Sequence, residues 1–369
     1  MKSFVKMILQ ILRRIDYITI YIICRVLCSV DEKKVLFLSD SRKDLSGNFA
    51  FLYDEIKDEY NVKSFLQHMD KGSKWSFCKE LAKAKYIFVD DFYPLIYPIP
   101  LRKETELIQL WHAVGAFKTV GFARKQNKDK FSMTHRNYTG TIVSSESIRE
   151  DYARAFRMDI KQVHSTGVPR TDIFWKQDYV DKKRQELYER YPILKSKKVI
   201  LFAPTFRGNN VNQAYYDWSQ LDFKSFQNRF AEEYVCIIKM HPFVKNVYEQ
   251  QLDPDFYLDL TREREINDLL LVTDVLITDY SSVIFEAALL DIYVIFFAYD
   301  LEEYIAERDF FYPYDSYTYG PVTKSQEELE AAIEEKNDYS EKKKEFVSYF
   351  MGSCDGCSTK RVVDTFLKR

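Results

Sequence analysis

The sequence predicts an α/β protein built from two Rossmann-like domains that face a cleft. At 369 residues the chain is longer than one hydrophobic core usually supports, so we expect two domains of ordinary size. Short, continuously apolar runs alternate with amphipathic segments, a pattern typical of parallel strands covered by helices on both faces. A charged stretch at residues 176–198 divides this pattern into two halves.

The first 30 residues are expected to form a separate amphipathic helix. Their longest uncharged stretch, residues 17–24, is far shorter than the ~20 residues that a membrane-spanning helix needs, and no signal-cleavage site follows it. An interfacial helix with basic side chains near lipid phosphates fits the pattern. The alternative is a helix packed on the protein's own surface, but the sequence offers no evident packing partner. The apolar positions are Phe4, Ile8, Ile11, Leu12, Ile15, Ile18 and Ile22, and the basic ones are Lys2, Lys6, Arg13 and Arg14.

The remaining chain is expected to divide into a domain at residues 31–178 and a second one at residues 179–369. The final helical stretch, residues 340–369, is assigned to the second domain, where it can pack back across the linker. Predicted strands are residues 34–39, 86–90, 106–111 and 141–145, then 198–204, 234–240, 275–279 and 293–297; predicted helices in the first half are 48–60, 74–83 and 146–156.

Charge and cysteine content exclude some classes of protein. The chain has 54 Lys and Arg against 56 Asp and Glu, so it lacks the basic excess that a dedicated nucleic-acid binder needs. Its six cysteines are scattered and form no framework of a secreted disulfide protein. This usage indicates a reducing, cytoplasmic setting.

Polar clusters follow four of the predicted strands, at the edge where such sheets bind ligands. The first cluster contains His112, Gly115 and Lys118, directly after residues 106–111. It offers a base, a flexible turn and a cation, because histidine with its pKa of ~6.5 can accept a proton from a hydroxyl near neutral pH. The alternative is a histidine that only caps a turn.

Two further clusters follow strands of the second half. Thr205 and Arg207 come after residues 198–204, and a hydroxyl with a guanidinium suits an anion-binding turn. His241 closes residues 234–240, where Pro242 ends the strand and leaves the imidazole at the rim of the sheet. For His241 a structural and a functional role stay equally open.

The fourth cluster combines Asp279, Ser281 and Ser282 between a strand and a helix. Hydroxyls and unpaired backbone N–H groups at a helix start are suited to binding phosphate. A serine that caps the helix is the structural alternative, and capping is compatible with phosphate binding.

No cofactor and no metal site are expected. Cys354 and Cys357 have CxxC spacing but lack a second pair, and no P-loop motif is present. Three other histidines lack convergent polar neighbours: His68, His135 and His164.

Taken in order, these segments resemble the CDP-glycerol glycerophosphotransferase family of teichoic acid synthesis. The resemblance spans roughly residues 33–365 and rests on WHAVGAFK (111–118), TGVPRTD (166–172), APTFRG (203–208), KMHP (239–242) and the run at 267–290. It implies a GT-B-like enzyme at the cytoplasmic face of the cell membrane. Such an enzyme moves glycerol phosphate or ribitol phosphate from CDP-glycerol or CDP-ribitol to a hydroxyl of an undecaprenyl-type lipid-linked acceptor and releases CMP.

The resemblance also implies roles for the two domains and for single residues. The first domain would face the acceptor and the membrane, and the second would bind the donor nucleotide. His112 and His241 match two functional histidines of the family, and Ser281 and Ser282 would hold donor phosphate. The WHA-x-GA form here is similar to short members that add one priming unit, whereas polymerases usually carry WHGTP.

The implied reaction is an in-line attack of the acceptor hydroxyl on the β-phosphorus of the donor. We hypothesise that His112 is the general base, while His241, the serine pair and Arg207 neutralise charge on the diphosphate. Two alternatives stay open from the sequence. One is a GT-B glycosyltransferase or nucleotide-sugar epimerase, and the other is a catalytically inactive, membrane-bound nucleotide-binding scaffold.

Overall fold

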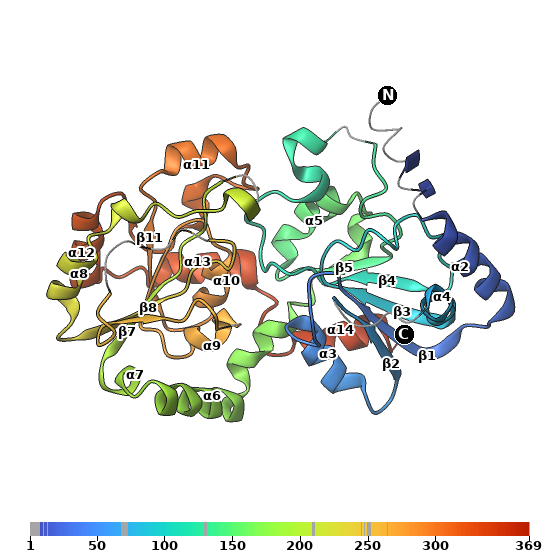
Figure 1. The fold of residues 1–369 in the computed structure, drawn as a ribbon, viewed down its shortest axis with the longest axis horizontal. Coiled ribbons are helices and arrows are strands. Elements are labelled where there is room, and N and C mark those ends of the chain that lie inside the picture. Colours follow the sequence, from blue (N-terminus) through green and yellow to red (C-terminus); the bar gives the residue numbers. More distant parts are fainter. Residues whose placement is uncertain are drawn as a thin grey trace. The chain divides into compact units, whose positions relative to one another are not determined.

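A computed structural model of the chain describes residues 8–9, 11–12, 14–67, 73–128, 131–208, 211–244, 246, 248, 252–263 and 265–368. The chain forms two compact units. The first comprises Met1–Asp172 with Tyr349–Arg369, and the second comprises Ile173–Ser348. Each unit contains one six-stranded sheet, and every strand pair in both sheets is parallel (Figure 1). The prediction of an α/β fold with two parallel sheets is therefore confirmed.

The sheet of the first unit has the strand order β2-β1-β3-β4-β5-β6. Its central strands each contain a buried apolar run, at residues 35–38 of β1, 86–89 of β3 and 107–108 of β4, as expected for strands covered on both faces. The strands are β1 (Asp31–Leu38), β2 (Asn61–Phe65), β3 (Ala84–Val89), β4 (Glu106–Gln109), β5 (Gly140–Ile142) and β6 (Val163–His164). The helices are α2 (Ile15–Leu27), α3 (Asn48–Ile56), α4 (Lys74–Lys83), α5 (Arg149–Phe156) and α14 (Ser358–Phe366).

The sheet of the second unit has the order β12-β11-β10-β7-β8-β9. The strands are β7 (Lys198–Phe202), β8 (Tyr234–Ile238), β9 (Tyr257–Asp259), β10 (Val275–Thr278), β11 (Tyr293–Phe297) and β12 (Val322–Thr323). The helices are α6 (Gln177–Arg190), α7 (Ile193–Ser196), α8 (Phe223–Phe230), α9 (Ile266–Leu270), α10 (Val283–Ala288), α11 (Leu301–Glu307), α12 (Gln326–Glu335) and α13 (Ser340–Met351). Short 3₁₀ turns lie at Gly121–Ala123, Lys125–Asn127, Glu146–Ile148, Ile160–Gln162, Pro169–Trp175, Val211–Gln213, Trp218–Gln220 and Tyr314–Tyr317.

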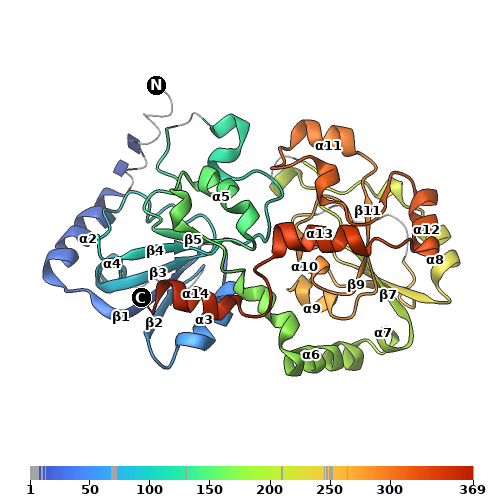
Figure 2. The same ribbon diagram turned by 180° about the vertical axis from the view of Figure 1, so that it is seen from behind.

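The C-terminal helix α14 belongs to the first unit, which differs from the expected division at residue 178 with residues 349–369 in the second domain. Figures 1 and 2 both show α14 beside α3. Its apolar side chains complete the core under β1 and β3, and Asp172 accepts hydrogen bonds from the backbone N–H groups of Ser358 (3.0 Å) and Thr359 (2.7 Å). The charged stretch expected as a linker contains α6, which lies in the second unit.

Helix α2 packs against α4 through one face. The ring of Tyr17 meets Phe77 edge-on at 6.1 Å, Asp16 pairs with Lys74, and Tyr21 is fully buried. The expected lack of a packing partner was therefore wrong, because α4 fills that place. Side chains outside this interface stay exposed and apolar: Ile15, Ile22, Ile23, Val26 and Leu27.

No helix in the described part of the chain is both long and apolar enough to cross a bilayer. Phe4, Lys2, Lys6 and Arg13 of the expected amphipathic helix lie outside the described residues, as does His68.

Candidate active site

His112 lies in a strained turn directly after β4. Trp111 adopts a left-handed backbone conformation (φ +56°), which is costly for an aromatic residue and needs support from its surroundings. Three hydrogen bonds supply that support. The Gln109 side chain accepts from the N–H of Trp111 (2.8 Å), and Asn48 donates to the Trp111 carbonyl (3.0 Å). Arg170 donates to the carbonyl of His112 itself (2.8 Å). The position of His112 is thus fixed from three segments of the first unit.

A chain of buried hydrogen bonds continues from this turn into the unit. The amide nitrogen of Gln109 donates to the hydroxyl of Tyr138 (2.7 Å), whose oxygen lies 3.1 Å from the hydroxyl of Tyr97. The Tyr97 hydroxyl in turn accepts from the N–H of Tyr93 (3.2 Å). Fully satisfied buried networks of this kind hold one arrangement, so Gln109 cannot turn away from Trp111 without breaking the chain. We call Trp111, Gln109, Tyr138 and Tyr97 the turn-support chain.

The imidazole of His112 faces a carboxylate. Its Nδ1 atom lies 3.4 Å from Oδ1 of Asp91, and its ring lies 4.4 Å from that of Trp111. A carboxylate only accepts hydrogen bonds, so Nδ1 carries the proton in this arrangement and Nε2 is the nitrogen that can accept another one. The His112 side chain is 46% exposed, so Nε2 is open to a reacting group. This is the geometry of an oriented general base.

The Asp91 carboxyl is suited to stay ionised. Burial alone would raise the pKa of Asp91. The hydrogen bond and the charge of His112 lower it, as do hydrogen bonds from the Phe92 N–H and from Ser41. Together they outweigh burial and leave the pKa of Asp91 below its usual range. A negative charge beside Nδ1 stabilises the protonated imidazole that forms when His112 accepts a proton.

Sequence analysis missed Asp91, Asn48 and Arg170. A signal was present for Asp91, since two acidic residues directly follow β3, the strand next to β4 in the sheet. The first of them, Asp90, pairs with Arg42, and the second faces His112. Of the residues predicted beside His112, Gly115 has a positive φ of +70° and its carbonyl accepts from Tyr152 (2.8 Å), while Lys118 lies further along the same loop.

The predicted residues of the second unit meet at one edge of its sheet. β10, β7 and β8 are neighbours and run parallel, so their carboxyl ends lie side by side. Thr205 follows β7, His241 follows β8, and Asp279 follows β10, with Ser281 and Ser282 at the start of α10. The N–H of Thr205 donates to Asp279 (2.7 Å), which joins two of these ends directly.

Arg207 is buried in an ion-pair network. Its Nη1 donates to Asp279 (2.8 Å) and to the carbonyl of Thr205 (2.5 Å), and its Nε and Nη2 donate to the two oxygens of Asp300 (2.6 and 2.8 Å). Burial alone would lower the pKa of this guanidinium, but Asp279 and Asp300 raise it, so the charge is held firmly. Four tyrosine rings surround the guanidinium with centroids 5.0–5.7 Å away: Tyr216, Tyr280, Tyr299 and Tyr304.

This network changes the expected roles of Arg207 and Asp279. Both were expected to bind donor phosphate. Arg207 is only 7% exposed and Asp279 is fully buried, and their polar atoms face each other and Asp300. The structure therefore gives them a scaffolding role, in which they tie together the ends of β7, β10 and β11.

Groups suited to contact a ligand surround this scaffold. Neither His241 nor the serine pair is fully buried, and the His241 ring lies 4.8 Å from Phe206 and 4.5 Å from the exposed Phe243. The side chain of Ser282 does not cap α10, although Ser281 accepts weakly from the N–H of Val283 (3.4 Å). The buried hydroxyl of Thr205 has no hydrogen-bond partner among the described residues. Hydroxyls not used by the fold remain available for phosphate oxygens.

Acidic, cysteine and histidine side chains of the described residues form no group of three that could hold a metal ion. The two cysteines of the CxxC sequence lie in different environments: Cys354 is buried and Cys357 is exposed.

Two parallel-sheet units with polar side chains at the carboxyl ends of their strands define a two-unit α/β protein, and such strand ends are where these sheets usually bind ligands. The solved structure titled "Structure of the Wall Teichoic Acid Polymerase TagF, H548A" shares this fold, with a TM-score of 0.78 over 99% of this chain and 97% of that chain at 21% identity. A family model fits residues 20–368, so the chain belongs to the CDP-Glycerol:Poly(glycerophosphate) glycerophosphotransferase family.

Curated relatives refine the comparison. A teichoic acid poly(ribitol-phosphate) polymerase of Bacillus spizizenii is 46% identical over 92% of this chain, which spans 56% of that relative's length. A teichoic acid ribitol-phosphate primase of the same organism is 37% identical, with 94% of each chain covered. Relatives named for glycerol phosphate match at 29–32% identity.

Asp91→Asn should impair the proton-accepting role of His112 while leaving the fold intact. We expect turnover to fall roughly 10- to 100-fold, as is typical when an orienting partner is lost. The loss should fall on kcat, with KM for the donor within a few-fold of the wild type, because Asp91 orients the base and contacts no donor group in this account. Steady-state kinetics measure both constants, with the exposed Asp54→Asn as the matched control. An unchanged kcat would show that Asp91 is only structural.

Arg207→Met should destabilise the second unit rather than only weaken ligand binding. It leaves two carboxylates at a buried site without their partner, which typically costs roughly 3–5 kcal/mol. Urea unfolding followed by circular dichroism measures the loss, and Lys324→Met, at an exposed ion pair with Glu302 in the same unit, should unfold like the wild type. If Arg207→Met is as stable as the wild type but no longer binds the donor, Arg207 binds the donor phosphate directly and the scaffolding role is wrong.

His135 offers a test of the packing behind the turn-support chain. It is buried among aromatic rings, including Phe92 (4.9 Å) and Phe156 (4.7 Å), and burial lowers its pKa to about 3. Between pH ~6.5 and 3 the unfolded chain binds a proton here that the folded chain does not. The contribution of His135 to the free energy of unfolding should therefore decline by up to ~1.4 kcal/mol for each pH unit below 6.5. NMR should find its ring neutral at pH 5, and a protonated ring at that pH would contradict the packing described.

Proposed function

We propose that this chain transfers ribitol phosphate from CDP-ribitol to a hydroxyl of a lipid-linked cell-wall polymer precursor and releases CMP. The observation that carries the proposal is an imidazole oriented by Asp91, at the end of β4 in a chain that belongs to this family. Ribitol is favoured over glycerol because the relatives named for ribitol phosphate are 37–46% identical, against 29–32% for those named for glycerol phosphate.

The proposed step is a single in-line displacement at the β-phosphorus of the donor. The acceptor oxygen forms a bond to this phosphorus, and the bond from the phosphorus to the bridging oxygen breaks, so CMP leaves with that oxygen. The proton of the acceptor hydroxyl passes to Nε2 of His112. Phosphoryl transfer depends mainly on positioning and on stabilisation of charge, so a base and a few donors suffice.

The donor diphosphate is proposed to lie at the carboxyl ends of β7, β8 and β10. The free hydroxyl of Thr205, the serine pair and His241 supply hydrogen-bond donors there, and the Arg207 network holds these ends in place. Preorganised donors around a developing charge are the main source of catalysis in such sites.

The protein is proposed to act at the cytoplasmic face of the cell membrane as a peripheral protein. Exposed apolar side chains at Ile8, Leu9 and Leu12, and along the outer side of α2, support this proposal. A helix that packs by one face and exposes apolar residues on another is suited to the lipid interface.

Mass spectrometry of a synthetic undecaprenyl-type acceptor tests the function directly. Incubation with CDP-ribitol should add the mass of ribitol phosphate and release CMP, while CDP-glycerol should react more slowly. The number of units added tests the expected resemblance to priming enzymes. Product from CDP-glycerol alone would overturn the choice of donor, and no product from either donor would favour the inactive scaffold.

His112→Ala should lower the rate of CMP release by roughly 10²–10⁴-fold, the usual contribution of a general base. Binding of CDP-ribitol, measured by calorimetry, should stay within a few-fold of the wild type, because the proposed donor site lies in the other unit. Near-normal CMP release by this variant would contradict the assignment of the base.

A further inference from the structure

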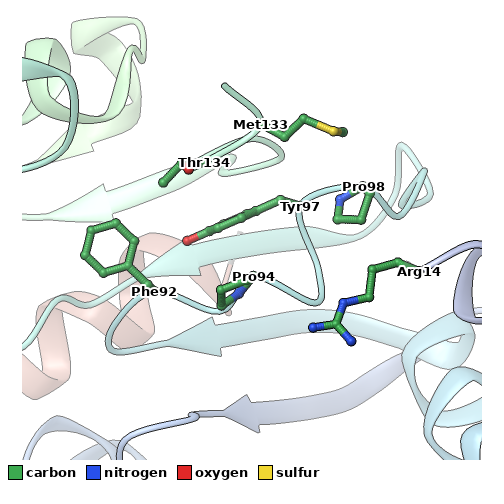
Figure 3. Close-up of a pocket in the computed structure, with 7 residues that line it drawn as sticks. All are labelled: Arg14, Phe92, Pro94, Tyr97, Pro98, Met133 and Thr134. Carbon is green, nitrogen blue, oxygen red and sulfur yellow. The ribbon is translucent and has the colours of Figure 1, made fainter. Parts of the chain in front are cut away.

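A pocket of about 240 Å³ lies in the first unit, and Figure 3 shows seven of the residues that line it. Its wall is largely apolar and comes from the loops before β4 and before β5: Phe92, Pro94, Tyr97, Pro98 and Met133. One charged side chain, Arg14, completes the lining from the residue before α2. An apolar pocket with a single polar group is typical of a site that binds one defined part of a ligand.

Arg14 brings one guanidinium to the wall of the pocket. In the part of the chain that the structure describes, this guanidinium makes no hydrogen bond or ion pair, although Asp16 two residues later pairs with Lys74. An unpaired guanidinium at an apolar wall favours an anion, and its planar donors match the oxygens of a phosphate.

The pocket wall and the His112 turn are physically connected. Phe92 follows Asp91 in sequence, and its ring meets that of Trp111 edge-on at 5.4 Å. Tyr97 is the last member of the turn-support chain, so its hydroxyl is hydrogen-bonded there while its ring lines the pocket. A ligand held here is therefore positioned relative to the base through the packing of Phe92 on Trp111 and the hydrogen bonds of Tyr97.

Exposed apolar residues lie within two sequence positions of two lining residues. Leu12 lies two positions before Arg14 and Ile15 directly after it, and Phe131, which is 61% exposed, precedes Met133 by two residues. Exposed apolar side chains around an apolar pocket with one cation indicate a ligand that is itself part lipid and part anion.

We propose that this pocket binds the phosphate-bearing end of a prenyl lipid, with the phosphate on Arg14 and the first isoprene units against Phe92, Tyr97 and Met133. Resting on the function proposed above, this lipid is the anchor of the acceptor. At about 240 Å³ the pocket is smaller than the ~300–1,000 Å³ of sites for whole drug-sized ligands, so it takes only this part of the acceptor. It would hold the anchor while the acceptor hydroxyl reaches His112.

Binding of farnesyl phosphate to the full-length protein tests the pocket without any turnover. We expect the wild type to bind it, and Arg14→Gln to bind at least tenfold more weakly. The matched control is Arg136→Gln, which removes the same charge from an exposed site in the loop that carries Met133 and should change binding less than twofold. Equal losses from the two variants would overturn the proposal, because general surface charge would then explain binding.

Other ligands separate the possible sources of the phosphate. Farnesol and inorganic phosphate should each bind far more weakly than farnesyl phosphate, since each offers half of the recognised chemistry. Dihexanoyl phosphatidic acid should also bind more weakly. If it binds as tightly as farnesyl phosphate, the pocket is a general phospholipid site and the proposal fails.

A second variant addresses the pocket itself. Thr134→Trp should fill the pocket and abolish farnesyl phosphate binding, while the affinity for CDP-ribitol, measured by calorimetry, is unchanged.

The kinetics with the lipid-linked acceptor test the anchoring role of Arg14. Arg14→Gln should raise the KM for this acceptor at least tenfold and leave kcat within twofold. A lower kcat with an unchanged KM would contradict an anchoring role. If the wild type binds farnesyl phosphate but does not transfer ribitol phosphate, the proposed function is wrong while the proposed binding site stands.

Discussion

The left-handed turn at Trp111 and the hydrogen bonds that hold it are the constraint on which the first unit depends. An aromatic residue at positive φ is stable only when its surroundings determine it fully, and the Gln109 side chain does this by accepting from the Trp111 N–H. Gln109 is itself held by Tyr138, and Tyr138 by Tyr97. The strain is thus balanced by a buried network, and its result is that His112 leaves the sheet edge with Nδ1 toward Asp91.

In the second unit, the strand ends that carry the candidate site are held together by buried ion pairs instead of neutral hydrogen bonds. Arg207 joins Asp279 and Asp300 in a buried cluster closed by tyrosine rings, and this cluster holds three strand ends in register. A buried guanidinium with both carboxylates in place has no spare charge for a ligand. The buried ions therefore shape this edge of the sheet, and the proposed contacts to the donor come from His241 and the serine pair, which are only partly buried. Removing the scaffold would also disturb ligand binding, so stability and binding must be measured together to separate the two.

Much of the fold could be predicted because parallel strands are continuous apolar runs. Eight such runs correspond to strands, and helix α4 has the predicted bounds. Strands β6, β9 and β12 have only two or three residues, too few to show a pattern. The place of α14 could not be predicted, because the apolar face of a helix does not show which sheet it covers; Val362 and Phe366 reveal it only through their contacts. The same limit applies to α2, whose buried residues Tyr21 and Cys24 do not stand out among its apolar neighbours.

The sequence predicts which residues of the candidate site lie at strand ends, but it does not predict which side chains pair with one another there. His112, His241 and the serine pair lie where the sequence placed them, since each directly follows a strand or starts a helix. The pairing of Arg207 with Asp300 joins residues 93 positions apart, and only the fold brings them together. The pairing of Asp91 with His112 depends on β3 and β4 being neighbours, which the sequence order suggests but does not fix.

The tautomer of the neutral His112 ring tests the central claim most directly. Nitrogen-15 NMR of the protein labelled at histidine, with His112→Gln used to assign the signal, distinguishes a proton on Nδ1 from one on Nε2. The account predicts the Nδ1–H form, because the Asp91 carboxylate can only accept from that nitrogen. A neutral ring with its proton on Nε2 would contradict the account, since that nitrogen could then not receive the proton of an acceptor hydroxyl.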